Sequence, residues 1–172
     1  MKTKKQEELI NLFLSELGDE IRPLYQEIAV YLSELGYYPR KQRSYIVFKH
    51  DLFSSQMAKM GMTWTKDHTS YFALRFSACK GYSRKFGGIV RDFIDKNQGR
   101  LFPHCEDGKC VFRADGDRTP FYEYTYPGGE VESFCGSFAL VIPDITSDDL
   151  EEIKRLIREE HEYLMGHEAG RG

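Results

Sequence analysis

The stretch Tyr122-Glu123-Tyr124-Thr125-Tyr126-Pro127-Gly128-Gly129 decides the fold, because it leads from one β-rich run into the turn before the next. Proline presets the backbone angle φ, and glycine accepts a positive φ at little cost, so the Pro-Gly-Gly segment predicts a β-hairpin. We therefore expect an antiparallel sheet.

A loop centred on Gly128 and Gly129 fixes the expected register of this hairpin, in which Tyr122 lies opposite Cys135. Side chains of a strand alternate between its two faces, so one side should carry Tyr122, Tyr124, Tyr126 and Cys135. The other side of the second strand should carry Phe134, Phe138, Leu140 and Ile142.

The segments around the hairpin predict an α+β fold. Apolar residues recur at helical spacing in residues 3–17, 19–36 and 80–97, and again after Thr146. Residues 45–49 predict a strand, and residues 61–65 and 69–78 predict a second hairpin. Residues 39–43, with Pro39 and several cations, are expected to form a connecting loop. The Met-rich residues 57–62 are interpreted as core filling in preference to a binding surface.

Together these elements predict a single domain over residues 1–172. Its helical part is residues 1–36, the sheet with a central helix is 37–145, the C-terminal helix is 146–166, and the tail 167–172 is expected to fray. The sheet should be antiparallel with about five or six strands, packed with two N-terminal helices, the central helix and the C-terminal helix.

Composition limits the classes of function. The net charge of −3 argues against a protein built to bind nucleic acid, although it leaves a local basic patch open. No apolar run is long enough for a signal peptide or a membrane span, so we predict a cytoplasmic protein without a membrane partner. In that reducing compartment the four cysteines are expected to be thiols or metal ligands.

A cluster of cysteines predicts a zinc site. Cys105 and Cys110 flank a short turn, and Cys135 lies in a later strand, which together supply three of the four ligands that tetrahedral zinc needs. The fourth ligand is either Cys79 or His104. The alternative is that Cys79 and Cys135 are small buried residues and the other two are reduced thiols.

A second candidate is a ligand pocket on the aromatic face of the sheet. If the sheet faces coincide, an apolar surface with polar tips and one cation suits a small, partly anionic ligand; its residues are Tyr71, Arg75, Tyr122, Tyr124 and Tyr126, with Ser133 beside them. The alternative is an aromatic layer covered by a helix, because cross-strand aromatic pairs stabilise a sheet without any ligand.

A third candidate is an anion site at the start of the central helix. Lys80, Ser83 and Arg84 combine cations with a hydroxyl cap where a strand leads into a helix. The segment lacks the spacing of any phosphate-binding loop, so an ordinary capped helix start is the alternative.

The hairpin, the Cys135-Gly136 strand and the helix after Pro143 resemble stand-alone bacterial proteins of unknown function, over about the last two-fifths of the chain. That resemblance implies no activity. Part of the plan is similar to gyrase-inhibitor-like effector-binding domains, which wrap a small-molecule pocket with sheet and helices. The chain departs from them in its helix after Ile142 and in having no duplicated strand-helix-strand unit.

The sequence therefore favours a non-enzymatic cytoplasmic binding protein, with a small molecule on the aromatic sheet face, a structural zinc, or both. One alternative is an enzyme that uses Cys135 or a metal-bound water. However, no nucleophile, base and orienting group can be named together. The other alternative is an interaction module whose aromatic surface contacts a protein partner.

Overall fold

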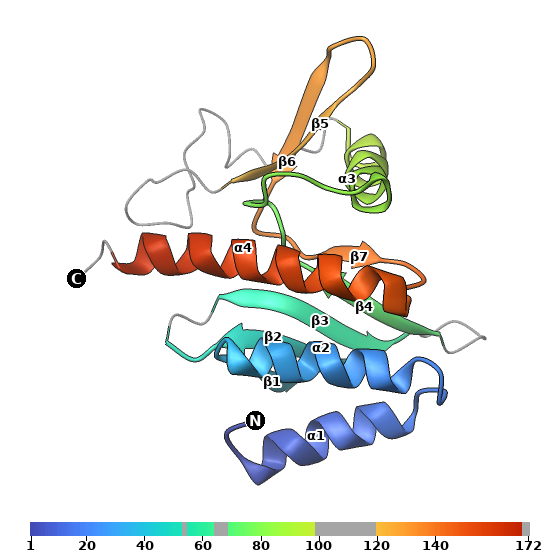
Figure 1. Cartoon of the computed structure of the whole chain (residues 1–172), viewed down its shortest axis with the longest axis vertical. Helices are drawn as coiled ribbons and strands as arrows, with labels where there is room; N and C mark the ends of the chain where they lie inside the picture. The colour runs from blue at the N-terminus through green and yellow to red at the C-terminus, as the bar shows by residue number, and fades with distance from the viewer. Residues whose placement is uncertain (53–54, 64–68, 99–119, 170–172) are drawn as a thin grey trace.

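The α+β fold is confirmed. A computed structural model describes residues 1–52, 55–63, 69–98 and 120–169, without the side chains of 167–169. The strands are β1 (Tyr37–Gln42), β2 (Tyr45–His50), β3 (Gln56–Met62), β4 (Ser70–Leu74), β5 (Phe121–Thr125), β6 (Val131–Cys135) and β7 (Leu140–Ile142). Five of them form an antiparallel sheet in the order β1-β2-β3-β4-β7, and β5 and β6 form a separate ribbon (Figure 1).

The four predicted helices are confirmed as α1 (Lys4–Ser15), α2 (Arg22–Glu34), α3 (Arg84–Lys96) and α4 (Leu150–Ala169), the last preceded by the short 3-10 turn η2 (Ser147–Asp149). Thr3 and Gln6 form a capping box at the start of α1, and the Ser83 hydroxyl caps α3. These side chains satisfy backbone N–H groups that have no partner within a helix, which explains where the helices begin.

Helices and sheet enclose one hydrophobic core. α2 and α4 lie side by side in front of the sheet, and α1 lies below them against β1 (Figure 1). The core face of the sheet contributes fully buried side chains from β2, β3 and β4, among them Phe48, Met60 and Phe72. Met57 is also fully buried, so the interpretation of the Met-rich segment as core is confirmed. Among the described helices, none has the length and apolar character that a membrane crossing requires.

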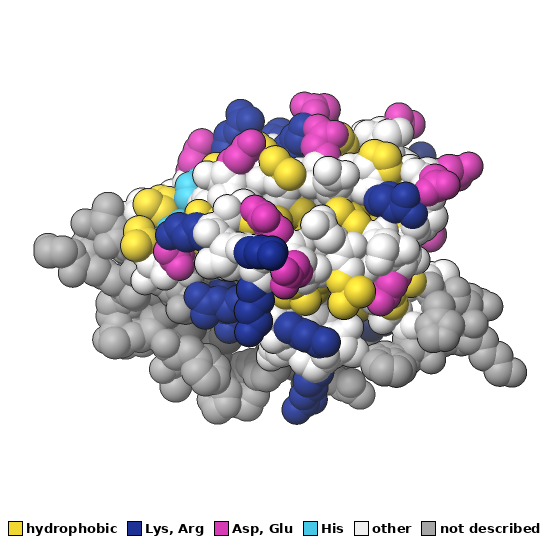
Figure 2. Space-filling view, turned by 90° about the horizontal axis from the view of Figure 1, so that it is seen from below, with side chains coloured by type: hydrophobic (Ala, Val, Ile, Leu, Met, Phe, Trp, Pro, Cys, Tyr) yellow, Lys and Arg dark blue, Asp and Glu magenta, His cyan; other side chains and the backbone are white. Residues whose placement is uncertain are grey.

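The charges on the surface are unevenly distributed. Seen from below, the molecule carries most of its Asp and Glu side chains in the upper part of the view, which holds α2 and α4 (Figure 2). The lowest coloured side chains in that view are lysines and arginines. The lower edge of this view is therefore locally basic, although the whole chain has a net charge of −3.

The expectation that residues 39–43 form a loop is wrong. Most of this segment belongs to β1, which pairs with β2 along its whole length, from Tyr37 opposite His50 to Gln42 opposite Tyr45. Proline has no N–H to donate, but β1 lies at the edge of the sheet, where an outward-facing N–H has no partner to lose. Edge position also keeps Arg40 exposed to water.

The predicted register of the Pro-Gly-Gly hairpin is also wrong by one residue. The loop has three residues, because the Tyr126 N–H donates to the Glu130 carbonyl oxygen and the Gly129 N–H donates to the Tyr126 carbonyl oxygen. Gly129 takes a φ of +87°, as a three-residue hairpin loop requires. Tyr122 therefore lies opposite Phe134, and Cys135 lies opposite Phe121.

The second predicted hairpin is confirmed in kind but shifted. Its first strand, β3, begins at Gln56, and its second strand, β4, ends at Leu74, before Arg75 and Cys79. Arg75 lies beyond the regular ladder, although its N–H still donates to the Met57 carbonyl oxygen.

Three chain segments approach one another closely at Gly136. The Ser77 hydroxyl donates to the Gly136 carbonyl oxygen over 2.9 Å. A Cβ atom at position 136 would lie 1.9 Å from the backbone oxygen of Pro120 and 2.3 Å from the Ser77 hydroxyl oxygen. Only a residue without a side chain fits between them.

We predict that Gly136→Ala lowers the free energy of unfolding by about 3 kcal/mol or more, because backbone must move to admit the methyl group. Urea unfolding monitored by circular dichroism measures the change. Gly128→Ala is the matched control, since nothing lies within 4 Å of the Cβ position in that turn, and it should cost less than about 0.5 kcal/mol. Equal midpoints for both variants would contradict the packing argument.

Candidate functional site

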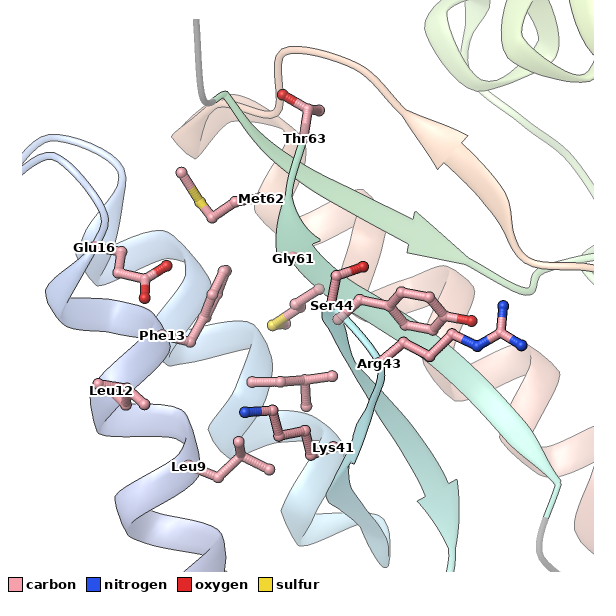
Figure 3. A pocket seen from close by; sticks show the side chains of 13 residues that line it. Leu9, Leu12, Phe13, Glu16, Lys41, Arg43, Ser44, Gly61, Met62 and Thr63 are labelled. Atoms are coloured by element: carbon pink, nitrogen blue, oxygen red, sulfur yellow. The ribbon is translucent and has the colours of Figure 1, made fainter. Parts of the chain in front are cut away.

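A cavity of about 400 Å³ lies between α1 and the sheet. Its lining comes from α1, from the β1–β2 hairpin and from β3, and consists of Leu9, Leu12, Phe13, Glu16, Lys41, Arg43, Ser44, Tyr45, Ile46, Met60, Gly61, Met62 and Thr63. In Figure 3, Leu9, Phe13 and Lys41 point into the space between the helix and the strands. The lining is mainly apolar, which is typical of small-molecule sites.

The walls of this cavity follow from the spacing of apolar residues on α1 and from the pairing of residues across the strands. Leu9 and Phe13 are four residues apart and share one face of α1. On the sheet, Lys41 of β1 lies opposite Ile46 of β2, which lies opposite Met60 of β3, so the three side chains form one row on the core face. A row that runs from an edge cation to buried apolar residues is the floor of the cavity.

The charges at this site are not neutralised by other described residues. Lys41 and Glu16 are exposed, and neither forms an ion pair within the described part of the chain. Lys41 points toward α1, Glu16 faces the same space from α1, and Arg43 extends away from the helix (Figure 3). An apolar cavity with two lining cations, Lys41 and Arg43, and the carboxylate of Glu16 can bind a molecule with an apolar body and a charged group.

The aromatic residues predicted to form one pocket are not brought together. Tyr122 is completely buried, and its hydroxyl accepts from the Phe76 N–H over 2.9 Å and donates to the Phe138 carbonyl oxygen over 2.8 Å. Tyr124 and Tyr126 lie on the β5–β6 ribbon beside α3, where Arg91 lies over the Tyr124 ring and the Tyr126 hydroxyl donates to Asp95.

The other two members of that predicted pocket are separated as well. Tyr71 lies on the sheet face remote from the core, since it alternates with buried Phe72. Arg75 is 8% exposed and points into the protein toward α4. Ser133 lies in β6 opposite Glu123, so the register places it on the other face of the ribbon from Tyr122.

Arg75 forms a buried ion pair with Glu160 of α4. Its Nε donates to one carboxylate oxygen over 2.6 Å, and the Ala78 N–H donates to the other over 2.8 Å. Glu160 is completely buried, and burial raises the pKa of its carboxyl group, while Arg75 and the Ala78 N–H oppose that shift. Glu160 was not singled out from the sequence, although it shares the apolar stripe of Ile153, Leu156, Ile157 and Leu164, which signals a buried carboxylate.

The predicted anion site is filled by the protein's own carboxylates. The Ser83 N–H donates to Glu152 over 2.8 Å, and the Lys80 N–H donates to Glu159 over 3.1 Å. Both carboxylates come from α4. Arg84 is exposed on the first turn of α3. The start of α3 is therefore an internally paired helix terminus, as in the alternative interpretation.

Cys105 and Cys110, on which the zinc prediction depends, lie outside the described residues. Cys79 donates from its thiol to the Leu156 carbonyl oxygen, and burial raises the pKa of that thiol, with Glu160 and Glu159 adding to the shift. Cys135 is buried and lies 3.0 Å from the Ser137 hydroxyl. Within the described ranges, no three His, Cys, Asp or Glu side chains are grouped to hold a metal ion.

Two histidines, His50 at the end of β2 and His161 in α4, lie close together. The His50 and His161 rings lie 5.9 Å apart, and His161 Nδ1 is 3.2 Å from the Tyr37 hydroxyl. Burial lowers the pKa of both imidazoles, and the neighbouring His161 lowers that of His50 further, whereas Asp51 acts in the opposite direction. The folded state therefore favours neutral imidazoles.

None of the protein-family models, curated proteins or solved structures compared with the chain matches it. The resemblances based on the aromatic hairpin remain predictions.

We predict that Glu160→Gln lowers the free energy of unfolding by about 3 kcal/mol, because it leaves the buried Arg75 guanidinium without a counter-charge. Chemical denaturation provides the measurement. Glu162→Gln, an exposed neighbour on α4, is the control and should change stability by less than about 0.5 kcal/mol. The double variant Arg75→Met/Glu160→Met should cost less than the sum of the two single methionine variants; strict additivity would argue against coupling.

We also predict that stability decreases when the pH falls below about 6.5, the ordinary pKa of histidine. The folded pKa values of His50 and His161 are lowered, so the unfolded chain binds more protons in the window between the folded values and 6.5. The free energy of unfolding, measured across that window, should fall less for His161→Gln than for the wild type. An identical pH dependence would show that His161 is not involved.

Proposed function

We propose that the chain is a binding protein for a small amphipathic molecule, with the apolar part between α1 and the sheet and an anionic group at Lys41. The observation that carries the proposal is the row of Lys41, Ile46 and Met60 along the floor of the cavity. The cavity volume of about 400 Å³ is within the usual range for ligand sites.

The position of Lys41 favours an anionic group on the ligand. Its side chain points into the cavity, and within the described residues it has no carboxylate partner (Figure 3). Lys41 lies at the exposed rim of an apolar cavity, where the apolar part of a bound ligand would displace water and so weaken the dielectric screening of its carboxylate. Glu16 lies on the α1 side and would oppose an anion that approached it.

The alternative of a cysteine enzyme has less support. Cys135 has Ser137 as its hydrogen-bond partner among the described residues, and a serine hydroxyl is a poor base for activating a thiol. The zinc hypothesis depends on Cys105 and Cys110 and stays a prediction, to be tested by metal analysis of the purified chain. A reducing cytoplasmic location remains part of the proposal.

We predict that the full chain binds decanoate more tightly than 1-decanol, and that decyltrimethylammonium binds weakly. Isothermal titration calorimetry measures the three affinities. Lys41→Gln should weaken decanoate binding about ten-fold, because it removes a charge-assisted hydrogen bond. Leu12→Ser should also weaken it with little effect on folding, since Leu12 lines the cavity and is 60% exposed.

The control within the cavity is Glu16→Gln, which should leave decanoate binding unchanged or make it tighter. Lys5→Gln, on an exposed part of α1, should have no effect. Equal affinity for decanoate and 1-decanol, or no response to Lys41→Gln, would overturn the proposal. Tighter binding of the ammonium compound that depends on Glu16 would reverse the charge assigned to the ligand.

A further inference from the structure

The face of the sheet remote from α1, α2 and α4 has its own pattern of side chains, although Arg43, Tyr45 and Gly61 also line the cavity. α1, α2 and α4 pack on the core face, and the alternation of side chains leaves the opposite set pointing the other way. We call this set the outer face; its strand residues are Tyr38, Arg40, Gln42, Tyr45, Val47, Lys49, Lys59, Gly61, Tyr71, Ala73 and Val141.

Two tyrosines on the outer face flank a glycine. Tyr45 of β2 lies opposite Gly61 of β3, which lies opposite Tyr71 of β4. A Cβ atom on Gly61 would lie 2.8 Å from Tyr71 Cε1 and 2.9 Å from Tyr45 Cβ, so the Tyr71 ring leans over the glycine. Both tyrosines are half-buried. Because Gly61 has no side chain, the Tyr45 and Tyr71 side chains can approach each other across it on the same face of the sheet.

Cations surround these rings. Lys59 Nζ lies 5.4 Å from the centroid of the Tyr45 ring, and Lys59 shares a cross-strand row with Arg40 through Val47. Lys49 belongs to the same face, and Arg43, in the turn before Tyr45, extends away from α1 (Figure 3). These four cations are exposed or half-buried and lie on or beside the outer face, around Val47 and Ala73, which are only 2% exposed.

Negative charge is absent from the strand positions that the structure describes on this face. Asp51, which follows β2, already forms an ion pair with Lys2 beside Tyr38. The net charge of −3 is therefore compatible with an outer face whose described strand positions carry cations and no carboxylate.

We propose that the outer face binds single-stranded nucleic acid, with bases stacking on Tyr45 and Tyr71 and phosphates contacting Lys59, Lys49, Arg40 and Arg43. Every base has a π-face that can stack on an aromatic ring, and a strand of phosphates matches a surface with cations and no strand carboxylates. The bases of a duplex are already stacked on one another and cannot reach a sheet surface in this way. The expected recognition is sequence-tolerant.

The combination of features favours nucleic acid over an acidic peptide. A peptide of Glu and Asp residues would use only the cations, and it has no flat rings for Tyr45 and Tyr71. The sequence-based expectation of no nucleic-acid partner came from net charge, which does not describe how charge is distributed between two faces.

The test is fluorescence anisotropy of the full chain with labelled single-stranded RNA of about 12 uridines, a duplex of the same length, and poly-glutamate as competitor. Binding should be specific to the single strand. The logarithm of the association constant should fall with the logarithm of salt concentration with a slope of about −2 to −3, since each of three or four phosphate contacts contributes about −0.7. Lys59→Gln should reduce the magnitude of that slope by about 0.7.

The aromatic part of the proposal needs its own variants. Tyr71→Leu should weaken binding about five-fold or more, and Tyr71→Phe should retain it, because stacking needs the ring and not the hydroxyl. Tyr71 does not line the cavity, so this variant separates the outer face from the decanoate site. Urea midpoints of both variants check that they are folded. Lys5→Gln serves as the charge-matched control.

Several outcomes would overturn the proposal. No binding of the single strand at low salt would do so directly. Equal affinity for duplex and single strand, or displacement by poly-glutamate at equal charge concentration, would assign the face to general attraction of polyanions. A folded Tyr71→Leu variant with unchanged affinity would eliminate base stacking.

Discussion

The buried carboxylate of Glu160 is the constraint on which the arrangement of the second half of the chain depends. It binds the Arg75 side chain and the Ala78 N–H, and its neighbours on α4 bind the N–H groups of Lys80 and Ser83. α4 thereby holds the whole connection between β4 and α3. Since the β5–β6 ribbon packs on α3, the position of the ribbon is also set from α4. A charge is costly to bury, so this pairing specifies one arrangement of the connection.

The sheet separates two chemically different environments. Its core face supports the three helices and, at the β1 end, leaves a cavity under α1 where Lys41 meets apolar side chains. Its outer face carries tyrosines and cations. Both depend on Gly61, which lines the cavity and gives the Tyr71 ring room on the other side. The backbone of β3 is thus shared by the two surfaces for which we propose different ligands.

Local patterns in the sequence predicted where the helices and strands lie better than they predicted how these elements pack against one another. The Ser83 hydroxyl indicated the start of α3, because capping is a local interaction. Pro39 suggested a loop, since nothing local shows that residues 37–42 will lie at a sheet edge that tolerates proline. The hairpin register failed by one residue because the sequence Pro127-Gly128-Gly129 fits both two-residue and three-residue loops. The cavity was not predicted, because it exists only where α1 meets β1, and the sequence does not show that contact. Glu160, by contrast, lies on the apolar stripe of its helix, so its burial could have been predicted from the sequence.

Pro39 also affects how the molecule behaves among copies of itself. The free edge of β1 could in principle accept a strand from a second chain, which is the usual start of sheet aggregation. Proline removes one N–H from that strand, and Arg40 and Lys41 would bring like charges together if two such edges paired. Pro39, Arg40 and Lys41 led the sequence analysis to predict a loop. The same residues disfavour pairing of β1 with a strand of a second chain, so the sheet ends at β1.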